Sequence, residues 1–194
     1  MIFGNASSGS GVNAKAKIAA WGLVLCSPIL YAFLGKWEGD SQYVVYADKL
    51  ADSLPTVCRG LTRHVTDTPI IVGERWTEQK CRHEEERAIV RVQTELVGCF
   101  ERKPPQSVFD AASSHAWNFG SGSTCGSAAM KAWNRGEWSL GCRRLEFGDD
   151  GRRVWSYVKD GNRGYRFVQG LANRRGAEHV MCMKPAHLGS FSVE

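Results

Sequence analysis

The sequence lacks several patterns that would assign a function class at once. No two cysteines stand in C-x-x-C spacing, so a zinc ribbon or a thioredoxin-type site has no support. His64, His83, His115 and His179 are not clustered in the way that metal ligands are, and no metal or cofactor is expected. A dense stripe of lysine and arginine, a nucleic-acid-binding motif, an internal repeat and a second globular domain are also missing.

The composition describes a folded chain with a modest positive charge. Its 194 residues suggest one compact domain, or a small domain with an appendage. With 43% hydrophobic and 23% charged residues, a packed core is expected rather than disorder. The net charge of +5 favours an anionic partner. Because nucleic-acid motifs are missing, an anionic membrane face or an acidic polymer is preferred over nucleic acid.

Cysteine is abundant and widely spaced. Wide spacing is typical of disulfides formed in an oxidising compartment, and the alternative is a set of buried free thiols. Six cysteines follow residue 50, and Cys26 is the odd one. Cys81 and Cys99 are expected near opposite ends of one helix, more than about 20 Å apart, and cannot bond to each other. The other pairings stay open. The seven are Cys26, Cys58, Cys81, Cys99, Cys125, Cys142 and Cys182.

The N-terminal part has the features of a membrane anchor. Residues 1–13 are small and polar and are expected to be flexible. After Lys15 and Lys17, residues 18–35 carry no charge and would reach about 27 Å as a helix, enough for a thin bilayer. The lysines would stay in the cytoplasm by the positive-inside rule. Residues 1–36 are therefore predicted to be a signal-anchor segment, with the span at about 18–35.

Two alternatives to an anchor remain for this segment. A cleaved signal peptide needs a small-x-small site at the end of the apolar run, and residues 32–35, AFLG, are a poor site. A buried core helix is the other alternative. The flanking lysines and the downstream cysteines weigh against it.

Periodicity and capping residues predict that most of the chain after residue 76 is helical. Thr77 is a suitable N-cap, and apolar residues at helical spacing continue to Leu96, with 84–86 (EEE) as the solvated face. Gln106 or Ser107 could cap the next helix. The core face of that helix would run from Val108 to Phe119. Helices are further expected over 127–134, 138–147 and 170–178, and the tail 184–194 is expected to be loose.

Residues 37–62 combine two carboxylates and a hydroxyl across a predicted helix end and a predicted β-hairpin. Cleavage of a glycosidic bond needs a proton donor at the leaving oxygen, and in the inverting reaction a second carboxylate aligns water. Glu38, beside apolar Trp37, fits the donor, because desolvation favours a protonated acid. Asp48 fits the group that aligns water, and Thr56 could hold the same water. The alternative is a solvated hairpin with ordinary surface acids.

The order of these residues carries a resemblance. Glu38-Gly39, then Tyr46-x-Asp48, then Thr56-Val57-Cys58-x-Gly60-x-Thr62 resembles the phage lysozymes of glycoside hydrolase family 24. Later segments agree and extend the resemblance over about 37–183. They are Phe109-Asp110-Ala111, Ala116-Trp117-Asn118-Phe119-Gly120, Cys125, Asn134-x-Gly136, Cys142, Gly170-Leu171-x-Asn173-Arg174-Arg175-x-x-Glu178 and Cys182.

The resemblance implies an α+β, lysozyme-like fold, with a small β-hairpin lobe, a larger helical lobe and the N-terminal signal-anchor helix. It implies a monomeric muramidase that cuts the β-1,4 bond between N-acetylmuramic acid and N-acetylglucosamine in peptidoglycan. Glu38, Asp48 and Thr56 would be catalytic. Asn118, Phe119 and Gly120 would line the cleft, and the domain would cover 37–183.

Two features of the resemblance leave alternatives open. Glu38 to Asp48 is one residue longer than usual and Asp48 to Thr56 two longer, so Asp52, or Asp40, could hold the anionic position instead of Asp48. Arg174, Arg175 and Glu178 would form a structural ion network that supports the site, in preference to a contact with substrate carboxylates.

The apolar N-terminal run resembles the signal-anchor-release segment of one endolysin class. This implies an enzyme held inactive at the host inner membrane, with a cytoplasmic N-terminus, and released to the periplasm on depolarisation. Cys26 could then exchange with a disulfide near the active site, with Cys58 as the candidate partner. The alternatives are a lytic transglycosylase and a catalytically silent, membrane-anchored peptidoglycan-binding protein.

Overall fold

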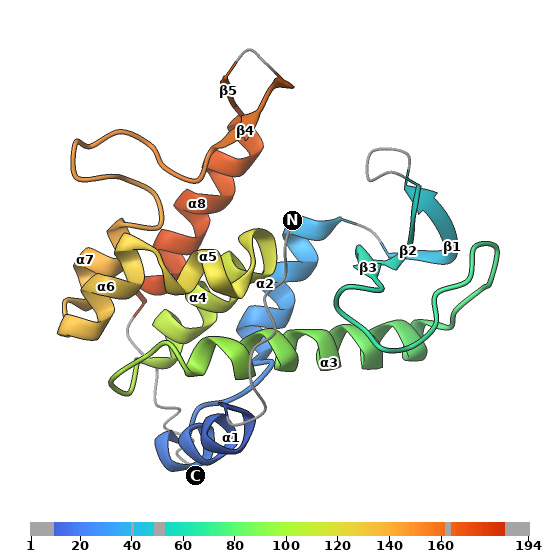
Figure 1. The fold of residues 1–194 in the computed structure, drawn as a ribbon, viewed down its shortest axis with the longest axis horizontal. Helices are drawn as coiled ribbons and strands as arrows, with labels where there is room; N and C mark the ends of the chain where they lie inside the picture. The colour runs from blue at the N-terminus through green and yellow to red at the C-terminus, as the bar shows by residue number, and fades with distance from the viewer. Residues whose placement is uncertain (1–9, 40, 49–52, 162–163, 185–194) are drawn as a thin grey trace, which may run out of the picture.

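The computed structural model describes residues 10–39, 41–48, 53–161 and 164–184. Eight helices and five short strands within these residues form a helical lobe and a small sheet lobe, joined by the long helix α3 (Figure 1). The expected α+β architecture, with a small lobe that carries a hairpin and a larger helical lobe, is confirmed. The helices are α1 (Ser10–Trp21), α2 (Pro28–Glu38), α3 (Glu78–Val97), α4 (Gln106–Phe119), α5 (Ser121–Cys125), α6 (Ala128–Arg135), α7 (Trp138–Arg143) and α8 (Gln169–Cys182).

The sheet lobe is an antiparallel sheet in the order β1-β2-β3. The strands are β1 (Gln42–Asp48), β2 (Leu54–Cys58) and β3 (Leu61–Thr62). Val45 and Val57 point to one face and are buried with Trp76 against the start of α3. The expected hairpin is therefore present, with one apolar face that anchors it to α3.

The helical lobe is built around α4, which contacts α2, α3, α5, α7 and α8. Its core is apolar and includes Phe100, Phe109, Met130 and Trp133, each at most 1% exposed. Thr77 caps α3 through a side-chain bond, as predicted, and Ser127, expected as the first residue of its helix, is instead the cap of α6. The expected cap of α4 at Gln106 or Ser107 was wrong: Pro105 holds the N-cap position, and no side-chain bond closes it.

The acidic triplet on α3 differs from its expected role. Only Glu86 is solvated, while Glu84 and Glu85 are 5% and 4% exposed. Glu84 accepts a bond of 2.7 Å from the Thr66 hydroxyl, and Glu85 accepts one of 3.1 Å from the Tyr31 hydroxyl. The expectation of a solvated face was wrong because partners from other elements satisfy both carboxylates, and these partners are invisible to helical periodicity.

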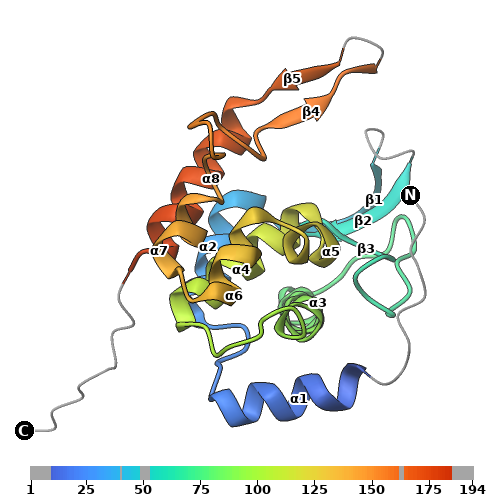
Figure 2. The ribbon, with the colours of Figure 1, turned by 60° about the vertical axis from the view of Figure 1, so that its left-hand side comes forward.

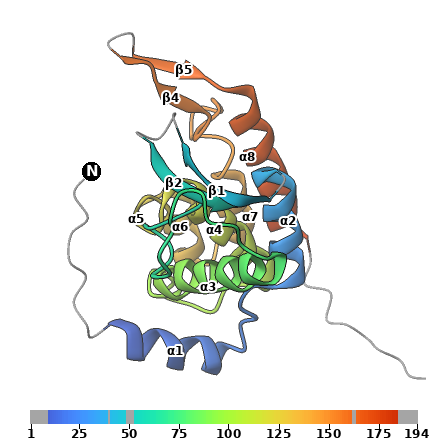
Figure 3. The ribbon, with the colours of Figure 1, turned by 90° about the vertical axis from the view of Figure 1, so that its right-hand side faces the viewer.

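The apolar N-terminal run forms two helices, not one. α1 begins at Ser10, within the stretch expected to be flexible, and ends at Trp21. Gly22 and Cys26 have φ of 59° and 45°, and Ser27 then caps α2, whose first residue is Pro28. Figures 2 and 3 show α1 packed beneath α3, and in Figure 2, where α3 is seen end-on, α1 crosses below it. Among the described residues, no helix has both the length and the apolar character needed to span a membrane.

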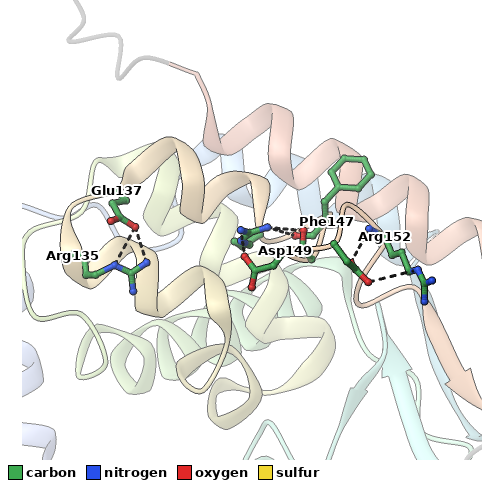
Figure 4. A network of polar contacts seen from close by, with 8 residues as sticks. Arg135, Glu137, Phe147, Asp149 and Arg152 are labelled. Carbon is green, nitrogen blue, oxygen red and sulfur yellow. Dashed lines mark hydrogen bonds and ion pairs between the residues drawn. The ribbon is translucent and has the colours of Figure 1, made fainter.

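A second hairpin, which the sequence did not suggest, precedes α8. It consists of β4 (Tyr157–Lys159) and β5 (Tyr165–Phe167) and projects from the helical lobe (Figure 2). The chain reaches it through a turn after α7, where the Arg144 guanidinium bonds Asp149 and donates 2.6 Å to the Gly148 carbonyl. Figure 4 shows this turn beside the exposed Arg135–Glu137 pair. The expected helix over 138–147 therefore ends earlier, at Arg143.

Candidate active site

Glu38 is the last residue of α2 and lies where the two lobes meet. Gly39 follows with φ of 78°, a left-handed conformation that ends the helix and turns the chain toward β1. The Glu38 side chain is 23% exposed, and its Oε1 accepts a bond of 2.7 Å from Arg174 Nη1 on α8. Because Arg174 is itself only 5% exposed, it holds this carboxyl in a fixed orientation.

A buried ion network supports Arg174. Arg174 Nε lies 3.5 Å from Glu178 Oε1, and the same oxygen accepts from Arg175 Nη2 at 2.8 Å and from the Ser114 hydroxyl at 2.7 Å. Burial raises the pKa of Glu178 to about 6 and lowers the pKa of Arg175 to about 10. Both groups are therefore charged at neutral pH. These contacts are those of the structural network favoured by sequence reasoning, with a direct bond from Arg174 to Glu38 added.

A groove of about 430 Å³ opens beside Glu38. The sheet lobe contributes Arg59, Gly60 and His64 to one wall, while the helical lobe contributes residues of α3 and the end of α4. Glu85 on α3 accepts a hydrogen bond of 3.2 Å from the Arg59 backbone N–H, and this bond links α3 to the sheet lobe. The groove thus runs between the lobes, and the Glu38 carboxyl is part of its lining.

Asp48 and Thr56 lie on neighbouring strands of the sheet lobe. The register places Tyr46 opposite Thr56 and Asp48 opposite Leu54, so Asp48 and Thr56 are diagonal neighbours on one face, about 7–8 Å apart. Thr56 is 3% exposed, and its hydroxyl donates 3.0 Å to the Leu54 carbonyl. The groove lining includes neither residue; the lobe reaches the groove through 59–65. Their joint action with Glu38 stays a prediction.

The two alternative aspartates cannot be placed in this geometry. Asp40 and Asp52 both lie outside the described residues. The choice between Asp48 and Asp52 therefore stays open, as it was from the sequence.

The predicted substrate-binding residues divide into two groups. Asn118 and Gly120 line the groove, and Trp117 joins them there. Phe119 is directed elsewhere: its ring lies 5.1 Å from the Trp155 ring and 4.8 Å from the Arg175 guanidinium. Sequence reasoning missed Arg59, Gly60 and His64, although Gly60 stood within a matched motif. A turn that follows a catalytic strand is the signal that could have found them.

The cysteines form three disulfides, which the sequence left unassigned. They are Cys58–Cys81, Cys99–Cys125 and Cys142–Cys182. The exclusion of a Cys81–Cys99 bond is confirmed. Cys26 has a free thiol, and burial is the main cause that raises its pKa to about 11. In this state Cys58 is bonded to Cys81, so an exchange with Cys26 stays a hypothesis.

Comparison with solved structures supports the fold. The muramidase domain of SpmX from Asticaccaulis excentricus matches with a TM-score of 0.68 and 17% identity, over 84% of this chain and 99% of that chain. An endolysin from the Escherichia coli O157:H7 phage FAHEc1 matches with a TM-score of 0.69 and 20% identity, over 84% and 94% of the two chains. A variant of P22 lysozyme matches with a TM-score of 0.63 and 17% identity, over 84% and 100%.

Sequence comparison identifies the family. No curated protein sequence gives a match. The phage lysozyme family, in contrast, matches residues 35–178, about three quarters of the chain and both walls of the groove. The chain therefore belongs to the phage lysozyme family.

Proposed function

We propose that this protein is an endolysin that hydrolyses the β-1,4 bond between N-acetylmuramic acid and N-acetylglucosamine in peptidoglycan and so lyses the host cell. Membership of the phage lysozyme family supports a peptidoglycan-lytic glycoside hydrolase. One observation of the site carries the proposal further. Glu38, whose carboxyl accepts a bond from the buried Arg174, lines a groove between the two lobes.

In the proposed reaction, the Glu38 carboxyl protonates the glycosidic oxygen as the bond breaks. Asp48 and Thr56 align the water that attacks the opposite face of the sugar, and the product anomer is inverted. Arg174 acts through Glu38 as a positioning residue, since its guanidinium fixes one carboxyl oxygen and leaves the reaction to the acid. No cofactor is required.

Loss of the acid is the direct test. Glu38→Gln keeps the size and the hydrogen-bonding oxygen of the side chain but cannot donate the proton. We expect clearing of a wall suspension to slow by on the order of a hundredfold or more. The matched control is Glu137→Gln, because Glu137 also pairs with an arginine, Arg135 at 2.7 Å, but lies outside the groove lining. Wild-type clearing by Glu38→Gln would refute the assignment of Glu38 as the acid, whereas a wild-type protein that fails to clear walls would favour a silent wall-binding protein.

The products and the remaining site variants refine the assignment. Hydrolysis leaves reducing ends on the fragments, whereas a lytic transglycosylase leaves anhydro ends, and mass spectrometry separates the two. Asp48→Asn, Asp52→Asn and Thr56→Ala then decide which carboxylate works with the hydroxyl. Of the two aspartate variants, the one with the larger loss of wall-clearing activity identifies the catalytic aspartate.

We also propose that the newly made enzyme is tethered to the host inner membrane by residues 18–35 and released from it into the periplasm. The proposal is supported by the uncharged run after Lys15 and Lys17. The tethered and described states exclude each other, because Leu30 and Leu34 are 0% and 5% exposed within the fold. While residues 18–35 span the bilayer, α2 cannot pack into the site, and Glu38 is held away from Arg174.

A further inference from the structure

The β4–β5 hairpin is largely exposed and projects from the helical lobe. In Figure 1 it stands on one side of the end of α2, which carries Glu38, and the β1–β2 hairpin stands on the other. Figures 2 and 3 show both hairpins projecting at the same end of the molecule. The position makes this hairpin a second arm beside the groove.

One face of the hairpin is aromatic. The register pairs Tyr157 with Phe167 and Lys159 with Tyr165, so these four side chains share a face, which we call the aromatic arm. Tyr157, Phe167 and Tyr165 are 43%, 40% and 76% exposed. The Tyr157 and Phe167 rings meet edge to face at 5.6 Å. Three exposed aromatic rings gathered on a projecting strand pair indicate a binding surface, since single exposed apolar residues are the ordinary case.

The base of the arm is fixed to the groove wall. Trp155 lies 4.6 Å from the His115 ring and 5.1 Å from the Phe119 ring, and Phe119 stands between the groove residues Asn118 and Gly120. The base of the arm is therefore attached to the end of α4, the helix that contributes residues to the groove wall.

The other end of the arm is also fixed. The Val168 N–H donates 2.8 Å to the Ser156 carbonyl and closes the hairpin, and α8 begins at the next residue. The same helix carries Arg174, which bonds Glu38. A glycan strand bound by the arm would thus be held at a fixed position relative to the Glu38 carboxyl.

We propose that the aromatic arm binds saccharide units of the peptidoglycan strand beyond the groove, and this rests on the proposed function. A groove of about 430 Å³ holds a small-molecule-sized part of a polymer, so the strand must continue past its ends. Pyranose rings have apolar C–H faces that pack on aromatic rings, and the hydroxyls around them remain solvated. Lys159 on the arm, and Arg166 behind it, suit the carboxylates of the stem peptides.

The charges of the arm disfavour a second copy of the chain as the occupant. Each strand has three residues and an exposed edge with a cationic side chain, Lys159 on β4 and Arg166 on β5. Lysine and arginine on short edge strands oppose edge-to-edge pairing, because two copies would bring like charges together. The glycan strand of the cell wall, whose stem peptides carry carboxylates, meets no such repulsion.

Binding to purified sacculi tests the arm without hydrolysis. In the Glu38→Gln background, co-sedimentation would be measured for the parent and for the variant that adds Tyr157→Ala, Tyr165→Ala and Phe167→Ala. We expect the Kd to rise about tenfold or more. Tyr165→Ala alone, at a side chain 76% exposed, should raise it several-fold without unfolding the protein, and Tyr165→Phe should restore it. The control is Ile71→Ala with Val72→Ala, which removes exposed apolar area outside the arm.

The contrary outcomes are distinct. Unchanged sacculus binding by both arm variants, or failure of the parent to bind, would overturn the proposal. Loss of binding to phosphatidylglycerol vesicles with unchanged sacculus binding would assign the arm to lipid instead. If the arm variants change the sedimentation coefficient of the protein without sacculi, the arm would be assigned to contact with a second copy of the chain. Since the assay needs no turnover, its result is independent of whether Glu38→Gln abolishes hydrolysis.

Discussion

At the scale of single residues, the site depends on polar groups that are buried in a region of mixed charge. His115 is fully buried, its Nδ1 lies 2.8 Å from the Thr124 hydroxyl, and its ring contacts Trp155 at the base of the aromatic arm. Desolvation, with Arg175 and Arg174 next, holds the pKa of His115 well below its usual 6.5. The ring is therefore neutral in the folded enzyme at conditions where the unfolded chain carries a charge.

This difference predicts a pH dependence of stability. The unfolded chain binds a proton at His115 below pH 6.5 and the folded chain does not, so stability is lost as the pH falls, by up to about 1.4 kcal/mol per pH unit. Glu178 acts in the opposite direction between pH 6 and 4.5, because its pKa is raised on folding. We expect the steepest loss just below pH 6.5, measured by urea unfolding at several pH values.

The control for this effect is His115→Gln, which can still bond Thr124 but does not titrate. Its unfolding free energy should be nearly flat between pH 7 and 6, whatever its absolute value. An equally steep fall in the variant would show that another group causes the dependence.

At the scale of elements, α2 is docked by side chains that contact the linker before it. Ser27 donates 2.7 Å to Asp110 Oδ2, and Gln106 donates 2.8 Å to Asp110 Oδ1. Gln106 also exchanges two bonds with the Val24 backbone, and Gln93 accepts one from the Cys26 N–H at 2.7 Å. These contacts fix the start of the helix whose last residue is Glu38.

Asp110→Ala is therefore expected to impair both docking and catalysis. It leaves the Ser27 hydroxyl and the Gln106 amide without their buried acceptor, at a cost of about 1–3 kcal/mol. Asp110→Asn retains one acceptor and should lose less. The rate of hydrogen exchange of the α2 amides should rise in the alanine variant. The rate of wall clearing should fall even under conditions in which the variant is fully folded. Unchanged exchange in α2 would mean that the apolar contacts of Leu30 alone hold the helix.

Elements with strong local signals were predictable, and those set by distant contacts were not. The cap of α3 at Thr77 was predicted, and helices in the regions of α3, α4 and α6 were expected. The β4–β5 hairpin was missed because three-residue strands are too short to show an alternating pattern. The split at Gly22–Ser27 had local signals in Gly22, Ser27 and Pro28, but uniform hydropathy obscured them. Likewise, the contact of Arg174 with Glu38 joins residues 136 apart in sequence, beyond any local pattern.

At the scale of the whole molecule, the N-terminal run has to suit two environments. In the described fold, Ile18, Leu23 and Leu30 are buried against the helical lobe. Val24 and Ile29 in the same run are 54% and 62% exposed. A bilayer would surround all of these side chains alike. The two states can therefore be separated by charges at the exposed positions.

We expect Val24→Lys with Ile29→Lys to abolish tethering but not catalysis. Each lysine would cost about 2.5–3.5 kcal/mol near the centre of a membrane span, but little at the surface of the folded enzyme. The purified variant should clear a wall suspension at the wild-type rate. In expressing cells it should leave the membrane fraction and fail to lyse them from within. Val180→Lys, at an α8 position that is also 62% exposed, is the control and should change neither result. A double variant that remains in the membrane fraction, or lyses cells normally, would refute the tether, because the enzyme would then reach the wall without residues 18–35 in the bilayer.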